Sequence, residues 1–476
     1  MLIRPAPYTR VGRERRGRLV SRISLFGQCS AVALLSLTVL ACGSARVSAE
    51  TLQDALAAAY LNNPVLSASR AQLRSVDENV PQALSGWRPV VTVTGSVGKG
   101  EFDTSIVTEQ NLTPKVATLD LNQPLYRGGR TVAATRQAEA QVQAGREQLR
   151  GSERDVLLAA VTAYLDVVRD GVRVGLTRNN EQVLRRQLQA TRDRFQVGEV
   201  TRTDVAQAEA RVARANSDRA AAEGDLQISR ATYERVVGSQ PGKLEPPPPL
   251  PSLPASLDDT TQTALRENPD VLRANYNEEA AKHAVRGALG VLYPSVSLVG
   301  RVQRSDEVVT ESLQTRNDSI VAQVVVPLYQ SGSEYSTVRQ AKEVRSQRML
   351  DIEQARRTAT EAARQSWEAL TAARERIKGR SEQVRANEIA LEGVRQEAAV
   401  GSRTTLDVLD AEQELLDSRV ALVIAERDEY VAAFRVVAAI GRLSAERLAL
   451  NVPLYDPSQH YNEVRDKWIG LSRPKD

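Results

Sequence analysis

Two carboxylates in the last third of the sequence have the spacing from which ion chemistry could be built. Asp407 and Asp410 are three residues apart, so on a helix their side chains share one face. If that face lined a narrow passage, the carboxylates would favour cations, and multivalent cations could plug the passage. Asp407 also completes a Thr-x-x-Asp pattern with Thr404, so capping of a helix N-terminus is an equally good interpretation of this residue.

Little else in the chain could carry out bond-making chemistry. The only histidines are His283 and His460, and both cysteines, Cys29 and Cys42, fall within residues 1–49. A metal cluster of histidines or thiolates is therefore not expected, nor is a disulfide framework. Motifs for phosphate binding, for a nucleophilic serine and for a zinc protease are missing. We expect no enzyme, no cofactor and no metal.

The N-terminal segment has the three parts of a secretory signal peptide. Residues 1–22 are rich in arginine, residues 23–41 are largely apolar, and Val47-Ser48-Ala49 is a small-x-small cleavage pattern. We expect cleavage after Ala49. A membrane anchor fits less well because the apolar run is short, and lipidation at Cys42 fits less well because the residues before it suit that pattern poorly. Translation could also start downstream, near Leu19 or Val20.

The net charge of +4 belongs to this N-terminal segment. Residues 1–49 hold eight arginines and one glutamate, which leaves 55 basic and 58 acidic residues, a net charge of −3, in the rest of the chain. Such a balance gives no reason to expect nucleic acid as a partner.

The rest of the sequence is a tandem duplication. Asn63-Pro64 recurs as Asn268-Pro269, 205 residues later, and Pro124-Leu125-Tyr126 recurs as Pro327-Leu328-Tyr329, 203 residues later. Further clusters recur in the same order with almost the same offset, as expected for a repeat. The expected domains are the signal peptide at 1–49, a first repeat at 50–240, a proline-rich linker at 241–256, a second repeat at 257–441 and a C-terminal tail at 442–476.

Each repeat contains a long segment without proline that is rich in Ala, Leu, Gln, Glu and Arg, which favours helix. Each segment is interrupted once, at Gly198 or at Gly401, because glycine ends one helix and the Thr-x-x-Asp that follows begins the next. We therefore predict helical hairpins at about 130–237 and 333–441. The first arm, at 130–197, would be about 100 Å long, so the helices must form a tubular bundle.

A strand pair precedes each hairpin, at about 88–124 and 293–327. Val91, Val93 and Val97 alternate with polar residues, and the second repeat copies this alternation. Each strand has roughly 8–10 residues, the length of a tilted strand that crosses a bilayer. No apolar run of membrane-helix length follows residue 50, so if the chain enters a membrane, it must do so as a β-barrel. Four strands cannot close a barrel alone, so other subunits must contribute.

This order of parts resembles the TolC family of outer-membrane channels over about residues 50–455. The most specific stretch is Val400-Gly-Ser-Arg-Thr-Thr-Leu-Asp-Val-Leu-Asp-Ala411, with its partner Val197-Gly-Glu-Val-Thr-Arg-Thr-Asp-Val205. The resemblance implies an α+β membrane protein of the Gram-negative outer membrane. It implies a homotrimer in which each chain gives four strands to a twelve-stranded β-barrel, with the hairpins forming a periplasmic tunnel and the C-terminal tail in the periplasm. The implied partners are a periplasmic adaptor, an inner-membrane transporter of ABC or RND type, and outer-membrane lipid.

The resemblance also implies a gate at the hairpin turns. Three copies of Asp407 and Asp410 would form two stacked acidic rings, and Arg403 would pair with Asp204 of the first hairpin as a latch that holds the tunnel shut. Ala398 departs from the family pattern, which has a tyrosine that forms a hydrogen bond in the latch. Either the latch is weaker here, or another residue forms the hydrogen bond in place of the tyrosine. Arg403 could also be an ordinary surface arginine.

The expected function is the exit duct of a tripartite export system. Cleavage after Ala49 without lipidation is typical of the secretion branch, so we expect type I protein secretion with an ABC transporter. Efflux of drugs or other small molecules is the alternative. A structural coiled-coil protein of the envelope is a further alternative, but it does not explain the duplicated strand pairs.

Overall fold

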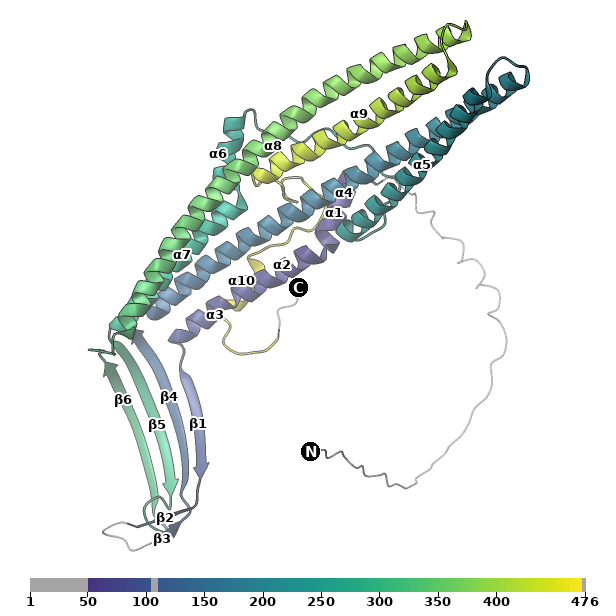
Figure 1. Ribbon diagram of the computed structural model, residues 1–476. Helices are drawn as coiled ribbons and strands as arrows, with labels where there is room; N and C mark the ends of the chain where they lie inside the picture. The colour runs from purple at the N-terminus through teal and green to yellow at the C-terminus, as the bar shows by residue number, and fades with distance from the viewer. Residues whose placement is uncertain (1–49, 104–109, 473–476) are drawn as a thin grey trace, which may run out of the picture. The chain divides into compact units, whose positions relative to one another are not determined.

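The computed structural model describes residues 50–103 and 110–472, so the expected cleavage after Ala49 and the alternative at Cys42 lie outside the described residues. Within them the chain forms long helical hairpins and a four-stranded antiparallel sheet (Figure 1). The expected α+β class, with four strands in one chain and an internal repeat, is confirmed. None of the helices in these two ranges is both long enough and apolar enough to cross a bilayer.

Each repeat contributes one hairpin of two long helices. The first arms, α4 (Arg130–Gln196) and α8 (Ser333–Ala399), are both 67 residues long, which corresponds to about 100 Å. The returning arms are α5 (Arg202–Val237) and α9 (Thr405–Ala439). None of the four contains proline, so the helical hydrogen-bond ladder is unbroken along each arm.

Shorter helices connect the hairpins to the strands. They are α1 (Leu52–Asn62), α2 (Pro64–Asp77), α3 (Asn79–Leu84) and the 3-10 turn η1 (Ser85–Trp87) in the first repeat, α6 (Leu257–Glu267), α7 (Pro269–Leu289) and the 3-10 turn η2 (Gly290–Leu292) in the second, and α10 (Gln459–Val464) after it. The largest core lies where α1, α4, α5 and α9 meet, and it includes Leu56, Leu157, Tyr233 and Val431.

The hairpins are packed mainly through small side chains. On α5 the buried residues Ala208, Ala215, Ala222 and Ser229 follow one another at intervals of seven. A seven-residue interval is the periodicity of a coiled coil, and small side chains allow two helix backbones to approach closely. This explains how a chain with 4% aromatic residues holds such long helices together.

The Asn-Pro pair forms the same joint in both repeats. The side chain of Asn63 accepts a hydrogen bond from the backbone N–H two residues later and donates to the carbonyl oxygen of Val236, both at 2.9 Å. Asn268 repeats both bonds at 2.9 Å, and its acceptor is the carbonyl oxygen of Ala439. Each asparagine therefore begins one helix, α2 or α7, and holds the last turn of a returning arm, α5 or α9.

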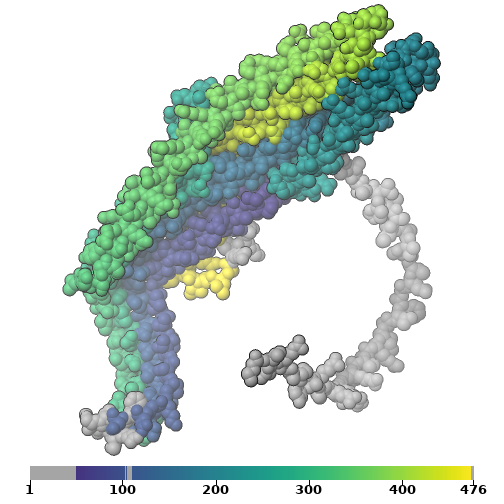
Figure 2. All heavy atoms as spheres, in the orientation of Figure 1, coloured from purple at the N-terminus to yellow at the C-terminus, as the bar shows by residue number. Residues whose placement is uncertain are grey.

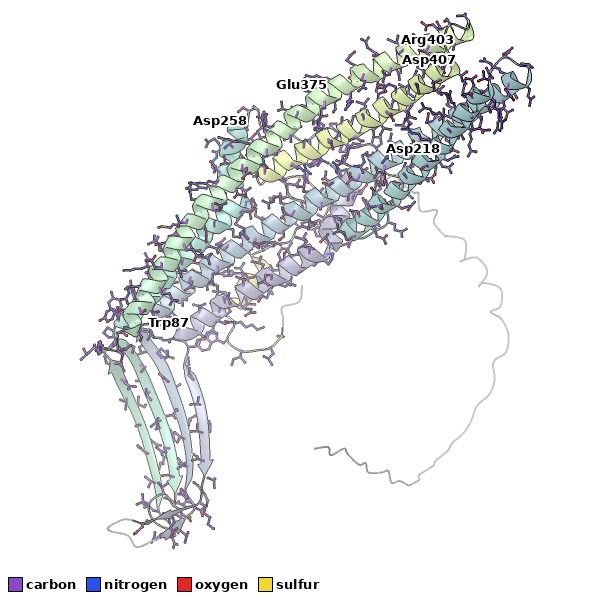
Figure 3. All side chains as sticks on the ribbon, viewed as in Figure 1. Trp87, Asp218, Asp258, Glu375, Arg403 and Asp407 are labelled. Atoms are coloured by element: carbon purple, nitrogen blue, oxygen red, sulfur yellow. The ribbon has the colours of Figure 1, made fainter. Side chains whose placement is uncertain are left out.

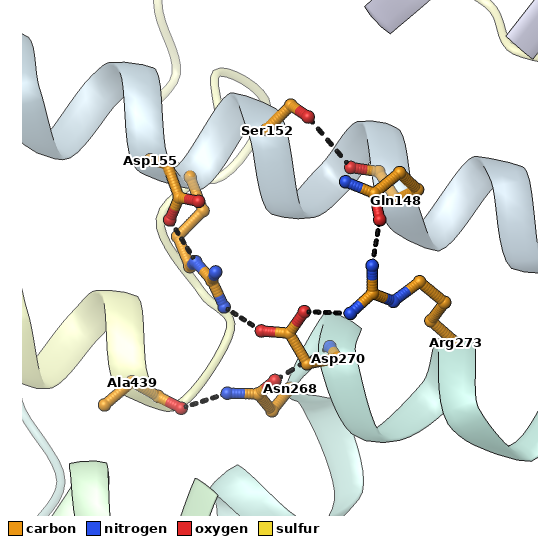
Figure 4. Close-up of polar contacts among 8 residues, drawn as sticks. Gln148, Ser152, Asp155, Asn268, Asp270, Arg273 and Ala439 are labelled. Atoms are coloured by element: carbon orange, nitrogen blue, oxygen red, sulfur yellow. Dashed lines mark hydrogen bonds and ion pairs between the residues drawn. The ribbon is translucent and has the colours of Figure 1, made fainter. Parts of the chain in front are cut away.

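Around Asn268 the joint continues into a polar network that connects the repeats (Figure 4). The carboxylate of Asp270 accepts from Arg154 at 2.9 Å and from Arg273 at 3.1 Å. Arg273 also donates to the side chain of Gln148. Since Arg154 and Gln148 lie on α4 and the other residues lie on α7, the network fixes the first repeat against the second.

We expect Asn63→Ala to lower the free energy of unfolding by about 2 kcal/mol, because it removes a helix cap and a buried hydrogen bond. Asn63→Ser should recover part of this loss, since serine caps a helix but is too short to reach Val236. Asn268→Ala and Asn268→Ser should behave in the same way, because the joint is duplicated. Thermal melting of the detergent-solubilised protein measures these effects. Equal stability of wild type and both alanine variants would contradict the assigned role.

The sheet has the strand order β1-β4-β5-β6 and is antiparallel throughout. Its strands are β1 (Val90–Val97), β4 (Lys115–Arg127), β5 (Ser295–Asp306) and β6 (Gln314–Val325). Because β4 pairs with β5, the strand pairs of the two repeats make one continuous sheet. β1 and β6 are its edges, and within the described residues neither has a partner on its outer side.

The strands depart from the expected lengths at two places. β4, β5 and β6 have 13, 12 and 12 residues rather than 8–10, because charged residues near the loops still pair their backbones, as Lys115 does with Asp306. The segment between β1 and β4 contains a short ladder of β2 (Gly100–Phe102) and β3 (Gln110–Leu112). Glu101 and Asn111 of this ladder are exposed, whereas Leu112 is completely buried.

Candidate functional site

The two hairpin turns have the same backbone geometry. Gly198 and Gly401 both have φ = +81°, a left-handed conformation that strains any residue with a Cβ. The N–H of Gly198 donates to the carbonyl of Phe195 at 3.0 Å, and that of Gly401 donates to the carbonyl of Ala398 at 3.1 Å. The helix before each turn therefore ends two residues before the glycine, at Gln196 or Ala399, and the glycine forms the turn as expected from the sequence.

Asp204 and Asp407 complete reciprocal caps at the start of the returning arms. The carboxylate of Asp204 accepts from the Thr201 N–H at 2.8 Å, and that of Asp407 accepts from the Thr404 N–H at 2.9 Å. In return, each threonine hydroxyl accepts from the aspartate N–H at 3.3 Å. The bonds from the backbone and side chain of Thr404, together with the charge of Arg403, lower the pKa of Asp407. Its carboxylate is therefore ionised at neutral pH.

Arg403 is held within its own turn. Its Nε donates to Glu397 Oε2 at 2.8 Å. Figure 3 labels Arg403 near the turn between α8 and α9. Glu397 directly precedes Ala398, the position where the sequence departs from the family pattern. Within one chain Arg403 is thus paired with Glu397, and Asp204 is engaged by Thr201. The Arg403–Asp204 latch is not formed inside the chain, and between neighbouring chains it stays a prediction.

Asp410 has a partner that the sequence did not suggest. Arg211 of α5 donates to the carboxylate of Asp410 on α9, so the pair connects the first hairpin to the second. The Asp410 side chain is still half exposed. Next to this pair, Leu409 packs against Leu184 and Ala215 of the first hairpin. The end of the second hairpin is therefore fastened to the first by one ion pair and a small apolar cluster.

Deeper in the hairpins, buried acids hold arms together rather than face a passage. Glu181 of α4 binds Arg185 at 2.5 Å and Arg219 of α5 at 2.7 Å. Glu412 of α9 binds Arg395 of α8 at 3.0 Å. Charges removed from water need such partners to be tolerated. In the described residues no group of three or more His, Cys, Asp or Glu side chains is arranged to hold a metal ion.

One aromatic side chain stands at the helix-side end of each strand of the sheet. Trp87 precedes β1, Tyr126 lies at the end of β4, Tyr293 precedes β5 and Tyr329 follows β6. All four side chains are exposed, although the chain has only 19 aromatic residues. We call this set the aromatic girdle. Aromatic rings gather in this way at membrane–water interfaces. Half of the girdle could be seen in the sequence, because Tyr126 and Tyr329 belong to the repeated Pro-Leu-Tyr motif.

The strands beyond the girdle expose apolar side chains. Val93 and Val97 of β1 are 77% and 75% exposed, and Ile320 of β6 is 79% exposed. Protein in water rarely presents a continuous apolar sheet surface with free edges. The surface needs an apolar cover on the face with these side chains, and the edges need pairing partners.

The chain has two long helical hairpins with polar turns, and they continue from one sheet that has free edges and an aromatic girdle. This combination defines an envelope channel protein rather than an enzyme. The family model described as outer membrane efflux protein matches residues 55–239 and 260–442, once in each repeat. The chain belongs to this family, and it is an outer-membrane protein. The resemblance to TolC channels seen in the sequence is thereby confirmed.

Individual relatives match over almost the whole chain. The outer membrane efflux protein BepC of Brucella suis biovar 1 (strain 1330) is 38% identical over 458 residues, 95% of this chain and 99% of BepC. The outer membrane protein TolC of Vibrio cholerae is 26% identical over 415 residues, 85% of this chain and 93% of TolC. The CmeC outer membrane channel of Campylobacter jejuni shares the fold, with a TM-score of 0.75 at 16% identity over 87% of this chain and 89% of CmeC.

Proposed function

We propose that this chain is the outer-membrane exit duct of a tripartite export system. In this proposal three copies join the free edges of their sheets, β1 of one to β6 of the next, and so close a barrel of twelve strands from three four-stranded sheets. The hairpins form a tunnel across the periplasm. A periplasmic adaptor and an inner-membrane transporter dock at its far end.

The observation that carries the proposal is the four-stranded sheet with two free edges, exposed apolar side chains and an aromatic ring at the base of every strand. Strand length supports it. Twelve residues extend about 40 Å, and a tilt of about 45° reduces this to about 28 Å along the membrane normal. The hydrocarbon core of a bilayer is about 30 Å thick.

For the cargo we propose small molecules, handled by an efflux pump. The support is the 38% identity to BepC, a protein named for efflux, over nearly the full length of both chains. Type I protein secretion is the second candidate. It is favoured by the signal peptide expected to end at Ala49, because cleavage there would leave the mature chain without an acylated cysteine.

Deletion of the gene in the source bacterium tests these two cargoes. If efflux is correct, the deletion lowers the minimal inhibitory concentration of several unrelated toxic compounds, the intact gene restores it, and the secreted proteins are unchanged. Loss of a secreted protein with unchanged resistance would assign the duct to type I secretion. A deletion without either effect, or a monomer on unboiled gels of outer membranes, would overturn the proposed duct.

We further propose that the tunnel closes at the hairpin turns. Asp407 and Asp410 from three chains then line the constriction as two acidic rings, and Arg403 reaches Asp204 of a neighbouring chain. Arg211 adds a second fastening, inside each chain, through its ion pair with Asp410. Opening requires the second hairpin to leave the first, so both fastenings have to break.

A further inference from the structure

The segment that follows α10 exposes a run of apolar side chains. Trp468, Ile469 and Leu471 are 65%, 90% and 104% exposed. Consecutive apolar residues at such exposure are unfavourable in water, and a chain end can easily fold them against its own core. These three residues, which we call the tail patch, instead point away from the core. Within residues 50–103 and 110–472 the tail patch has no apolar cover, so it needs an apolar partner beyond these residues.

The tail patch is carried by a firmly attached element. Val464 at the end of α10 is completely buried. His460 Nδ1 lies 3.2 Å from Oδ2 of the buried Asp77 on α2. Tyr461 lies under the guanidinium of Arg146, 5.6 Å from the ring centre. With α10 fixed to α2 and α4 by three different contacts, the position of the residues that follow it is set by the fold.

Arg88 places the tail patch at the foot of the sheet. Its Nη1 donates to the carbonyl of Lys467 at 2.9 Å, and its guanidinium lies over the ring of Trp468, 5.0 Å from the centre. Arg88 stands between Trp87 of the aromatic girdle and Val90, the first residue of β1. Figures 1 and 2 show the yellow tail beside this junction of helices and strands, where Figure 3 labels Trp87. The tail patch is therefore level with the girdle.

We propose that the tail patch inserts into the periplasmic leaflet of the outer membrane and is a lipid anchor separate from the barrel. This inference rests on the proposed function, which puts the sheet in the bilayer. Tryptophan prefers the interface, and isoleucine and leucine prefer the acyl region just beyond it. Arg88 and Lys467 border the patch with positive charge, which suits the phosphate groups of phospholipids, whereas Arg465 lies within ion-pair distance of Glu139 and Asp466.

The three tryptophans of the chain allow a direct test, because Trp87, Trp367 and Trp468 can each be kept alone by Trp→Phe changes at the other two positions. The variants are purified as the full chain and reconstituted into vesicles of phosphatidylethanolamine and phosphatidylglycerol with brominated acyl chains, which quench nearby indoles. We expect strong quenching for Trp87 and for Trp468. Trp367, which lies in the middle of α8, serves as the control and should keep its fluorescence.

Quenching of Trp87 without quenching of Trp468 would overturn the lipid anchor and leave the proposed duct intact. Lack of quenching at both positions would overturn the membrane position of the sheet itself. A second measurement does not depend on tryptophan. The expected mature chain has no cysteine, so Ile469→Cys can carry a single nitroxide label, with Glu463→Cys on α10 as the control. Greater accessibility of label 469 to oxygen than to a water-soluble nickel chelate is expected, and the reverse would overturn the anchor.

Discussion

Replacing Asp407 and Asp410 together by alanine is expected to weaken block of the channel by trivalent cations more than tenfold. In the proposed trimer the change removes six carboxylates from the constriction, and a multivalent cation is held there by their combined charge. Single-channel recording in planar bilayers measures the concentration of a hexaammine cobalt ion that halves the conductance. We expect this concentration to rise by more than tenfold, which corresponds to about 1.4 kcal/mol of binding free energy.

Capping and cation binding by Asp407 can be separated. Asp407→Asn keeps a side-chain oxygen that can accept from the Thr404 N–H, so it removes the charge with little loss of the cap. Asp417→Ala is the matched control, because Asp417 lies further along α9, is exposed and bonds only to Gln413 among its described contacts. Block that is unchanged in the double alanine variant, or that is weakened equally in Asp417→Ala, would show that the rings are wrongly assigned.

Arg211→Ala is expected to raise the resting conductance, because it removes the ion pair between the two hairpins of each chain. An exposed pair contributes at most about 1 kcal/mol, so three pairs that break together can shift the equilibrium towards the open state by up to about a hundredfold. The same variant should strengthen trivalent block, since Asp410 loses its competing cation. Arg403→Ala should also raise the conductance, but without this gain in block.

Arg214→Ala provides the control for both arginines. Arg214 lies one turn after Arg211 on α5 and pairs with Asp218 of the same helix at 3.6 Å, so its loss should leave the hairpins fastened. If Arg211→Ala conducts like the wild type, the ion pair does not hold the channel shut. If Arg403→Ala conducts like the wild type, its bond to Glu397 is only a stabilising contact of the turn.

The parts of the fold that could be predicted depend on local signals. Proline costs a helix interior about 3 kcal/mol, so proline-free segments located α4 and α8 to within a few residues. The glycine turns and the Thr-x-x-Asp caps are likewise short-range features. The local sequence pattern correctly placed Gly198 in a hairpin turn and Asp407 in a helix cap. Alternation of valine and threonine found β1 because residues two apart share a face of a strand.

Other features depended on contacts that no local pattern records. Arg211 and Asp410 are 199 residues apart, and their pairing depends on how the two hairpins pack. The partner of Arg403 is Glu397, and no sequence pattern distinguished this glutamate from the many other acidic residues of its helix. The repeated Pro-Leu-Tyr motif signals only Tyr126 and Tyr329 of the aromatic girdle, and the sheet brings Trp87 and Tyr293 to the same level. Each of these residues is separated from the others by many intervening positions.

The duplication has one more consequence at the turns. The second turn carries Glu397, Arg403 and Asp410, whereas the equivalent positions of the first, 203 residues earlier, carry Arg194, Val200 and Gln207. Both turns nonetheless share the same glycine geometry and the same cap. A trimer would therefore arrange six turns of equal shape around the tunnel mouth. All six would carry the capping aspartate, Asp204 or Asp407, but only alternate turns would hold Asp410 and Arg403. The backbone at the tunnel mouth would have approximate sixfold symmetry, but its side chains would have only threefold symmetry. Ions and adaptor subunits would therefore meet two kinds of site that alternate around the mouth.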